Sequence, residues 1–233
     1  MDPSELPPIS FGDGAFVHRK YLNPATVTSI ALQSMQALED LHHLGYIHRS
    51  LCKTDAQREI RKDNYGIGMP PNDKVVYILD FGLSTRFKTE KGALIPQREK
   101  ASFVGTRTFA SRATLSLGEQ NDFHDFESWA YMILAMYDWR NITWRPRGDT
   151  EMPKKEQAKI KDDFLKNLDS NPPNVPPGFL KVLAMLNNDP SVGFDFEKAK
   201  EYLVNECPNT PSTDPFDWND YPPPPYPPIP TKQ

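Results

Sequence analysis

The sequence predicts a mainly α-helical fold with a small β component, and three observations lead to this expectation. A helical apolar pattern follows Asn23, a short β-branched run extends from Val75 to Leu79, and a nearly apolar run extends from Phe126 to Tyr137. The 233 residues are 38% hydrophobic and 25% charged, which is typical of a globular protein with a sizeable core.

The first helix is predicted to begin at Asn23-Pro24, which supplies an N-cap and a proline at the first helical position. Gly45 can take the left-handed conformation that ends a helix. Apolar residues recur at steps of three and four, which predicts an amphipathic helix with one buried face: Val27, Ile30, Ala31, Met35, Leu38 and Leu41.

The later elements follow from the same kind of pattern. The run from Val75 to Leu79 is short and β-branched, which predicts a buried strand ending at Asp80. The run from Phe126 to Tyr137 is apolar on all sides, which predicts a helix surrounded by protein. Three more helices are predicted at about Lys154 to Leu168, Gly178 to Leu186 and Phe196 to Asn205.

The composition divides the chain into three parts. Residues 1–17 are rich in proline, glycine and acidic side chains, which predicts an irregular segment. Residues 18–205 are expected to form the folded domain. Ten of the 24 prolines lie between Pro208 and Pro230, so residues 206–233 are expected to be a disordered proline-rich tail.

Charge and cysteine content exclude several classes of protein. A formal net charge of -4 argues against a nucleic-acid partner bound by neutralising phosphates. Two cysteines, Cys52 and Cys207, are too few for a cysteine zinc site or a disulfide-stapled secreted module. The chain start has no signal-peptide pattern, and the run from Trp129 to Tyr137 is too short to span a bilayer. We therefore expect a soluble, cytoplasmic or nuclear protein without a membrane partner.

Asp80-Phe81-Gly82 is the motif that points to a function. A carboxylate at a strand end, followed by a flexible glycine, is the arrangement with which kinases hold magnesium against phosphate oxygens. His48-Arg49 lies upstream, and Gly105-Thr106 and the segment 125–129 lie downstream. This order and spacing resembles the casein kinase I family of protein serine/threonine kinases, including its tau-tubulin-kinase-like branch. The resemblance covers about residues 18–205 and implies the fold of a protein-kinase C-terminal lobe.

The family's catalytic loop can be aligned with this sequence in two registers. Counted directly from His48-Arg49, the family's base Asp, Lys and Asn fall on Ser50, Cys52 and Asp55, and the chemistry is lost. In the second register they fall on Glu59, Arg61 and Asn64, and residues 50–58 are an insertion. We adopt the second register because it places Asn64 sixteen residues before Asp80, as in the family. The alternative is that this polar run is an exposed loop.

The resemblance assigns a role to each residue of the second register. Glu59 stands where an Asp orients the substrate hydroxyl, and Arg61 stands where a Lys contacts the γ-phosphate. Asn64 and Asp80 stand at the positions that bind ATP through Mg²⁺. Glu59 is one methylene longer than Asp, and a misplacement of about 1 Å can cost on the order of a hundredfold in rate. Arg61 is planar and larger than a point-like lysine, so impaired catalysis is expected.

Little sequence precedes the first predicted helix. The family carries a strand-rich first lobe there, with a glycine loop, a strand lysine and a helix glutamate, whereas about twenty residues precede Asn23 here. Gly12-Asp13-Gly14 is therefore interpreted as a hinge-region turn. We expect a truncated casein-kinase-I-like domain that acts as a pseudokinase or docking module for a protein partner or substrate. The alternative is an active ATP-dependent kinase whose first lobe is missing from this sequence.

Three further features are weaker. Arg86 and Arg107, with Lys88, are candidates for an anion site that takes acidic or pre-phosphorylated substrates, and the alternative is a solvated basic face. Asp125 resembles the family's helix-start aspartate, which holds the catalytic loop through its backbone. His124 is expected to be a surface or packing residue.

The tail contains a candidate docking motif. Pro223-Pro224-Pro225-Tyr226 fits the pattern that binds WW domains as a polyproline helix, and the prolines around it could serve SH3 domains. A proline-tail adaptor with a passive globular part is therefore a third functional hypothesis.

Overall fold

A computed structural model describes residues 22–49, 64–68, 71–96, 107–145 and 152–208 of the chain. It also describes four short strands by their backbone: β1 (Ile9–Phe11), β2 (Ala15–Val17), β4 (Lys53–Thr54) and β5 (Ile60–Arg61). The fold is mainly helical, as predicted, and the strands are few and short.

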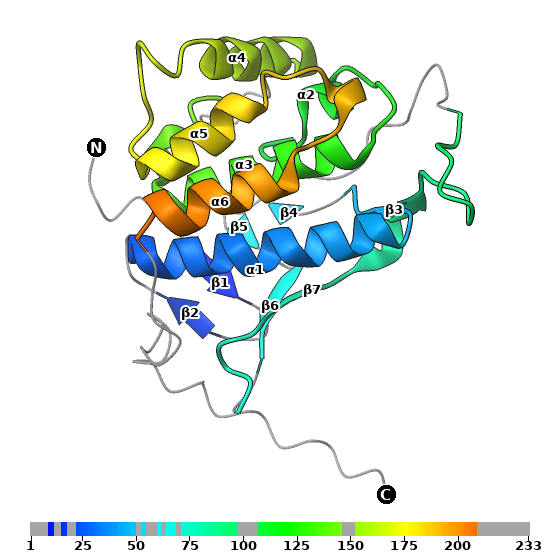
Figure 1. Cartoon of the computed structure of the whole chain (residues 1–233). Helices are drawn as coiled ribbons and strands as arrows, with labels where there is room; N and C mark the ends of the chain where they lie inside the picture. The colour runs from blue at the N-terminus through cyan, green and yellow to red at the C-terminus, as the bar shows by residue number, and fades with distance from the viewer. Residues whose placement is uncertain are drawn as a thin grey trace, which may run out of the picture.

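Helix α1 (Pro24–His43) confirms the predicted start and end. The Asn23 side chain accepts a hydrogen bond from the Ala25 N–H at 2.9 Å, and Gly45 follows the helix with φ at +85°. The face predicted to be apolar is buried, including Val27, Ile30 and Met35. Helix α1 packs against α3 and α6 on one side and against strand β7 on the other (Figure 1).

Helix α3 (Asp122–Tyr137) is the centre of the core. Trp129 and Tyr131 are both 0% exposed, so the predicted surrounded helix is confirmed. It begins four residues earlier than predicted, because the Asn121 N–H donates to His124 Nδ1 at 3.0 Å and satisfies one donor of the first turn.

The remaining helices surround α3 (Figure 1). The predicted C-terminal helices are confirmed as α4 (Lys154–Lys166), α5 (Pro177–Met185) and α6 (Phe196–Glu206), and α5 packs on α6. The described residues add the short α2 (Arg112–Leu115) and three 3₁₀ turns, namely η2 (Phe81–Leu83), η3 (Trp139–Asn141) and η4 (Pro190–Val192). None of the described helices combines the length and the hydropathy needed to cross a bilayer.

The strands in the described part of the chain form three small sheets. Strands β6 (Tyr65–Ile67) and β7 (Val76–Ile78) form an antiparallel hairpin that packs on α1. Strand β3 (Tyr46–Ile47) pairs with β8 (Thr85–Arg86) at the end of α1. The third sheet has the strand order β2-β1-β5-β4.

Two expectations from the sequence are corrected by these strands. Residues 1–17 were expected to be irregular, but they contain the strands β1 and β2, which pair antiparallel with Ser10 opposite Phe16. The interpretation of Gly12-Asp13-Gly14 as a turn lies outside the described residues. The run from Val75 to Leu79 was expected to be fully buried. Val76 is buried, but Val75, Tyr77 and Leu79 are exposed, because only one face of the hairpin packs on α1.

Candidate functional site

The β6–β7 hairpin brings Asn64 and Asp80 to the same end of a small sheet. Tyr65 pairs with Ile78 in the ladder, and one step further the Leu79 N–H donates to the Asn64 carbonyl at 2.7 Å. Asp80 is the next residue along the chain. The two polar residues that the sequence singled out, sixteen residues apart, are therefore neighbours across the end of the hairpin.

Asp80 has the left-handed conformation, with φ 57° and ψ 72°, which is uncommon outside glycine. Its carboxylate is exposed and accepts a hydrogen bond from the Gly82 N–H at 3.2 Å. A Cβ atom at position 82 would lie 3.1 Å from Asp80 Oδ1, so the close approach favours glycine. Asn64, in contrast, is 0% exposed.

His48 supports the backbone just before Asp80. Its imidazole is buried, and Nε2 lies 2.9 Å from the Leu79 carbonyl oxygen, so Nε2 carries the proton and donates. The same ring meets the edge of Phe81, with 5.5 Å between the centroids. His48 thus contacts the residues on both sides of Asp80.

Asp125 is the buried anchor of this region. Its carboxylate accepts hydrogen bonds from the His48 N–H at 2.6 Å and the Arg49 N–H at 2.9 Å, and His42 Nε2 lies 3.0 Å away. Burial alone would raise the pKa of Asp125, but these bonds and the charge of His42 outweigh it and hold that pKa below 3.8. Arg49 has φ at +68°, so Asp125 stabilises a strained turn.

Gln33 connects the hairpin to α1. Its side-chain amide donates to the Lys74 carbonyl at 3.1 Å and accepts from the Val76 N–H at 3.0 Å. The bond to Val76 occupies the edge of β7 that does not pair with β6. Helix α1 therefore fixes the position of the strand that ends at Asp80.

The donor chemistry of Asn64 and Asp80 suits a hard cation. An amide oxygen and a carboxylate oxygen are the ligand types that Mg²⁺ prefers. Within the described part of the chain, no group of three or more His, Cys, Asp or Glu residues could hold a metal ion. The pair therefore fits a magnesium ion that is shared with phosphate groups better than one held in an all-protein cage.

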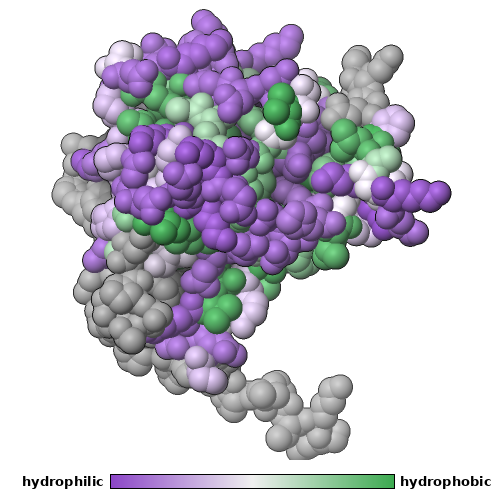
Figure 2. Space-filling model, in the orientation of Figure 1, coloured by the Kyte–Doolittle hydropathy of each residue, from purple (hydrophilic) through white to green (hydrophobic). Residues whose placement is uncertain are grey.

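The surface around Asp80 is apolar. Figure 2 shows hydrophobic side chains beside the hydrophilic helical surface near this hairpin. Alternate residues along one segment are exposed, namely Val75, Tyr77, Leu79, Phe81 and Leu83. Contiguous exposed apolar side chains are typical of surfaces that contact another molecule.

The structure says little about the other predicted site residues. Glu59 and the tail residues Pro223, Pro224 and Tyr226 lie outside the described residues, as do Ser50, Cys52 and Asp55 of the direct register. Arg61 is described only as backbone of β5.

The two arginines of the predicted anion site contact different parts of the fold. Arg86 lies over the Tyr46 ring, 5.4 Å from its centroid, and its Nη1 is 3.4 Å from Glu90. Arg107 donates from Nη1 to the Met152 carbonyl at 3.3 Å. Their described contacts therefore do not bring them together, and the anion site stays a prediction.

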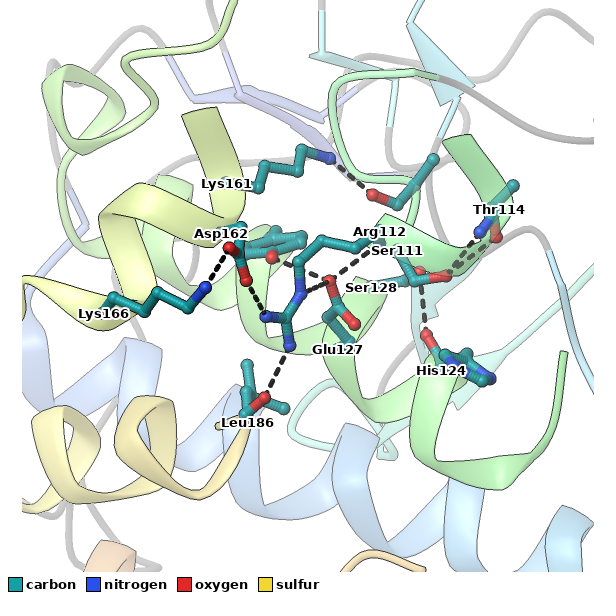
Figure 3. A network of polar contacts seen from close by, with 12 residues as sticks. Ser111, Arg112, Thr114, His124, Glu127, Ser128, Lys161, Asp162, Lys166 and Leu186 are labelled. Carbon is teal, nitrogen blue, oxygen red and sulfur yellow. Dashed lines mark hydrogen bonds and ion pairs between the residues drawn. The ribbon is translucent and has the colours of Figure 1, made fainter. Parts of the chain in front are cut away.

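A buried polar cluster around Arg112 escaped the sequence analysis. Figure 3 shows its guanidinium between Glu127, Asp162 and the Leu186 carbonyl. The three bonds measure 3.0, 3.0 and 2.6 Å, and Tyr131 also donates to Glu127 at 2.8 Å. Burial lowers the pKa of Arg112, but the charge of Glu127 and these bonds outweigh it and raise that pKa.

The Arg112 cluster connects elements that are distant in the sequence. Arg112 is on α2, Glu127 on α3 and Asp162 on α4, and Leu186 follows α5. An open cleft of about 320 Å³ lies beside it, but the charged groups that line the cleft already bond to one another. The cluster is therefore structural. His124, which was expected to be a surface or packing residue, is a buried packing residue. It accepts a hydrogen bond from the Asn121 N–H, and burial lowers its pKa.

Comparison with known proteins agrees with the resemblance at the level of protein kinases. A Caenorhabditis elegans protein with the name of a casein kinase I is 31% identical over 204 residues, which are 85% of this chain and 55% of the relative. Two serine/threonine-protein kinases of the same organism, one of them spe-6, are 33% and 35% identical over 135 and 128 residues. These matches cover 57% and 53% of this chain, and 38% and 31% of the relatives.

The chain thus spans about half, or less, of the length of the curated relatives it matches. No protein-family model matches the sequence. Its homologues are serine/threonine protein kinases, including one that is casein-kinase-I-like, and its helical fold is consistent with a kinase C-terminal lobe.

Proposed function

We propose that this chain is a casein-kinase-I-like kinase domain with impaired catalysis, which binds Mg²⁺–ATP weakly and serves mainly as a docking module for a protein. The assignment to a tau-tubulin-kinase-like branch belongs to the same proposal. Asp80 and Asn64 would hold the metal, and the bound ion would link the nucleotide phosphates to the hairpin end.

The neighbouring placement of Asn64 and Asp80 carries this proposal. A two-strand hairpin holds the pair, His48 supports it from behind, and Asp125 fixes the His48 backbone. A backbone that already holds the two residues side by side lowers the conformational cost of bringing them to one ion. The carboxylate of Asp80 is exposed, so an ion can reach it from solvent.

The sequence supports impaired catalysis. In the adopted register, Glu59 replaces the Asp that orients the attacking hydroxyl and Arg61 replaces the phosphate-binding Lys. Phosphoryl transfer depends almost entirely on positioning and electrostatic stabilisation. Both replacements change the position of a charged group at the reacting atoms, so both are expected to slow the transfer.

Titration calorimetry of the full chain with Mg²⁺–ATP tests the binding step. We expect weak binding that Asp80→Ala or Asn64→Ala weakens about tenfold or more, since losing about 1.4 kcal/mol at one ligand has that effect. Asp55→Ala is the matched control, because Asp55 would be the metal ligand in the direct register. Loss on Asp55→Ala with no change on Asn64→Ala would reject the adopted register.

A phosphotransfer assay tests the impairment. With radiolabelled ATP and an acidic protein substrate, the unmodified chain is expected to give no turnover above background. Turnover that Asp80→Ala abolishes would instead favour the active-kinase alternative. The double variant Glu59→Asp with Arg61→Lys measures how much of the impairment comes from the loop, because it restores the family's two residues.

A further inference from the structure

Lys161 is a fully buried lysine on α4, and its ammonium group points at a turn of the chain. It is 0% exposed, and its Nζ lies 3.2 Å from the Arg107 carbonyl and 2.5 Å from the Ala110 carbonyl. The same nitrogen lies over two aromatic rings, 4.6 Å from the Tyr131 centroid and 5.3 Å from that of Trp144. Figure 3 shows the side chain extended from α4 to its backbone partner.

Three carbonyls of the turn from Arg107 to Ala110 accept hydrogen bonds from side chains. Lys161 takes the carbonyls of Arg107 and Ala110, and the Trp144 indole N–H donates to the Thr108 carbonyl at 2.7 Å. Gln157, one helical turn before Lys161 on α4, donates to the Trp144 carbonyl at 3.1 Å. Helix α4 therefore determines the conformation of this turn directly and through Trp144.

Ionisable groups from two other helices face Lys161. Glu127 and Tyr131 come from α3 and Arg112 from α2, whereas the neighbouring Asp162 of α4 bonds to Arg112 and Lys166 instead. Glu127 and Arg112 have opposite effects on Lys161. The negative charge of Glu127 favours the protonated amine, and the positive charge of Arg112 disfavours it. Arg112 already bonds to Glu127 and Asp162, so neither carboxylate is reserved for Lys161.

We propose that Lys161 is the positioning residue of the Arg107–Ala110 turn, and that it couples opening of this turn to uptake of a proton. The turn closes over the amine and excludes water from it. When the turn opens, the amine is hydrated and binds a proton with its ordinary affinity.

The direction of the coupling follows from burial. Burial lowers the pKa of Lys161 from 10.5 to about 7, so the closed turn holds a mostly neutral amine above that pH. A neutral amine keeps two N–H groups, which is enough for both carbonyls. Between about pH 7 and 10.5 opening takes up one proton, so each unit of falling pH eases opening by up to about tenfold. Below pH 7 the dependence disappears.

The turn matters because of where it lies in the chain. It directly follows Gly105-Thr106, in the segment that resembles the end of a kinase activation segment. The view that this turn meets a peptide substrate rests on the proposed function. The positioning by Lys161 does not, because it depends only on the contacts just described.

Hydrogen exchange of the full chain tests the proposal without any nucleotide. Amides of residues 108–111 are compared with amides of α5 and α6 at pH 7.0, 7.75 and 8.5, after correction for intrinsic rates. We expect protection of the turn to rise several-fold with pH in the wild type, and the α5 and α6 amides to change much less.

Lys161→Met removes the titrating group and keeps an apolar chain of similar length. We expect its turn to be about tenfold less protected at pH 8.5 and to lose the pH dependence. Lys159→Met, an exposed lysine on the same helix, is the control and should match the wild type. A wild-type turn with pH-independent protection, or a Lys161→Met turn that keeps the slope, would overturn the proposal. If Lys161→Met does not fold, the wild type alone still tests the proposal, because protection of its turn that does not change with pH would overturn it.

Discussion

The helical block around α3 and the β6–β7 hairpin differ sharply in how they are buried. Trp129 and Tyr131 in the block are 0% exposed, whereas Tyr77 is 44% and Leu79 41% exposed on the hairpin. Well-buried elements open only with the whole molecule, and poorly buried ones open locally. The helical block is therefore expected to supply most of the stability of the fold, and the candidate site lies on the hairpin, which is expected to open more easily.

Two aspartates of the site, Asp125 and Asp80, differ in burial in the same way. Asp125 is 1% exposed and accepts bonds from two backbone amides, and Asp80 is exposed in a left-handed conformation. A buried carboxylate with several donors stabilises the fold, whereas an exposed one remains accessible to an ion. Substitutions at these two positions should therefore affect different measurements.

Asp125→Ala is expected to have the largest effect on stability. It leaves the His48 and Arg49 amides without their acceptor and removes the partner of His42. Losing a buried charged partner of this kind costs about 3–5 kcal/mol of the free energy of unfolding. Urea unfolding measures the change, and Asp163→Ala, an exposed carboxylate on α4, is the control. A loss under about 1 kcal/mol would show that the hairpin end does not depend on the block.

The contribution of Asp125 to the free energy of unfolding is expected to fall in acid. Because the pKa of Asp125 is held below 3.8 in the folded state, its contribution to stability is fully present above that pH. The contribution is lost as the pH falls through the lowered pKa. The wild type should therefore lose stability in this acid range more steeply than Asp125→Ala, and equal slopes would contradict the assignment.

Local sequence patterns were sufficient for the long helices of this fold, but not for β1, β2 or α2. The positions of α1, α3 and the three C-terminal helices follow from residues that repeat within one or two helical turns, such as Val27, Ile30 and Met35. The approach of Asn64 to Asp80 was expected only from the resemblance, which makes both residues magnesium ligands. The β6–β7 hairpin that brings them together was not predicted, because no pattern in the sequence marked β6 as a strand.

The polar interior could not be predicted in this way. Arg112 bonds to groups 15, 50 and 74 residues away, and nothing in its own surroundings indicates them. Lys161 lies in a charged run that reads as a solvated helix face. The one available signal was the spacing of Gln157, Lys161 and Leu165, which the fold buries at successive turns of α4.

Gln33→Ala is expected to lower the stability of the hairpin by an intermediate amount, because Gln33 connects the hairpin to α1. It removes two hydrogen bonds to β7 and its flank, each worth about 0.5–1.5 kcal/mol. We expect the Val76 amide to exchange faster while α5 and α6 amides are unchanged. Gln36→Ala is the control, because the Gln36 amide bonds to Glu39 and Asp40 on the same helix. Equal loss of protection throughout the chain would show that hairpin and block unfold together.

The double variant Val75→Thr with Tyr77→Thr is expected to have the smallest effect on folding and a clear effect on association. Both side chains are exposed, and threonine is β-branched, which suits a strand, so the free energy of unfolding should change by no more than about 0.5 kcal/mol. Exposed apolar patches promote self-association, so light scattering at high protein concentration should fall. Val192→Thr is the control, because Val192 is 82% exposed in η4, away from the hairpin. If the control lowers scattering as much as the double variant, the hairpin face is no more adhesive than any exposed valine. If only the double variant does, this face is where a further part of the protein, or a partner, would cover the site.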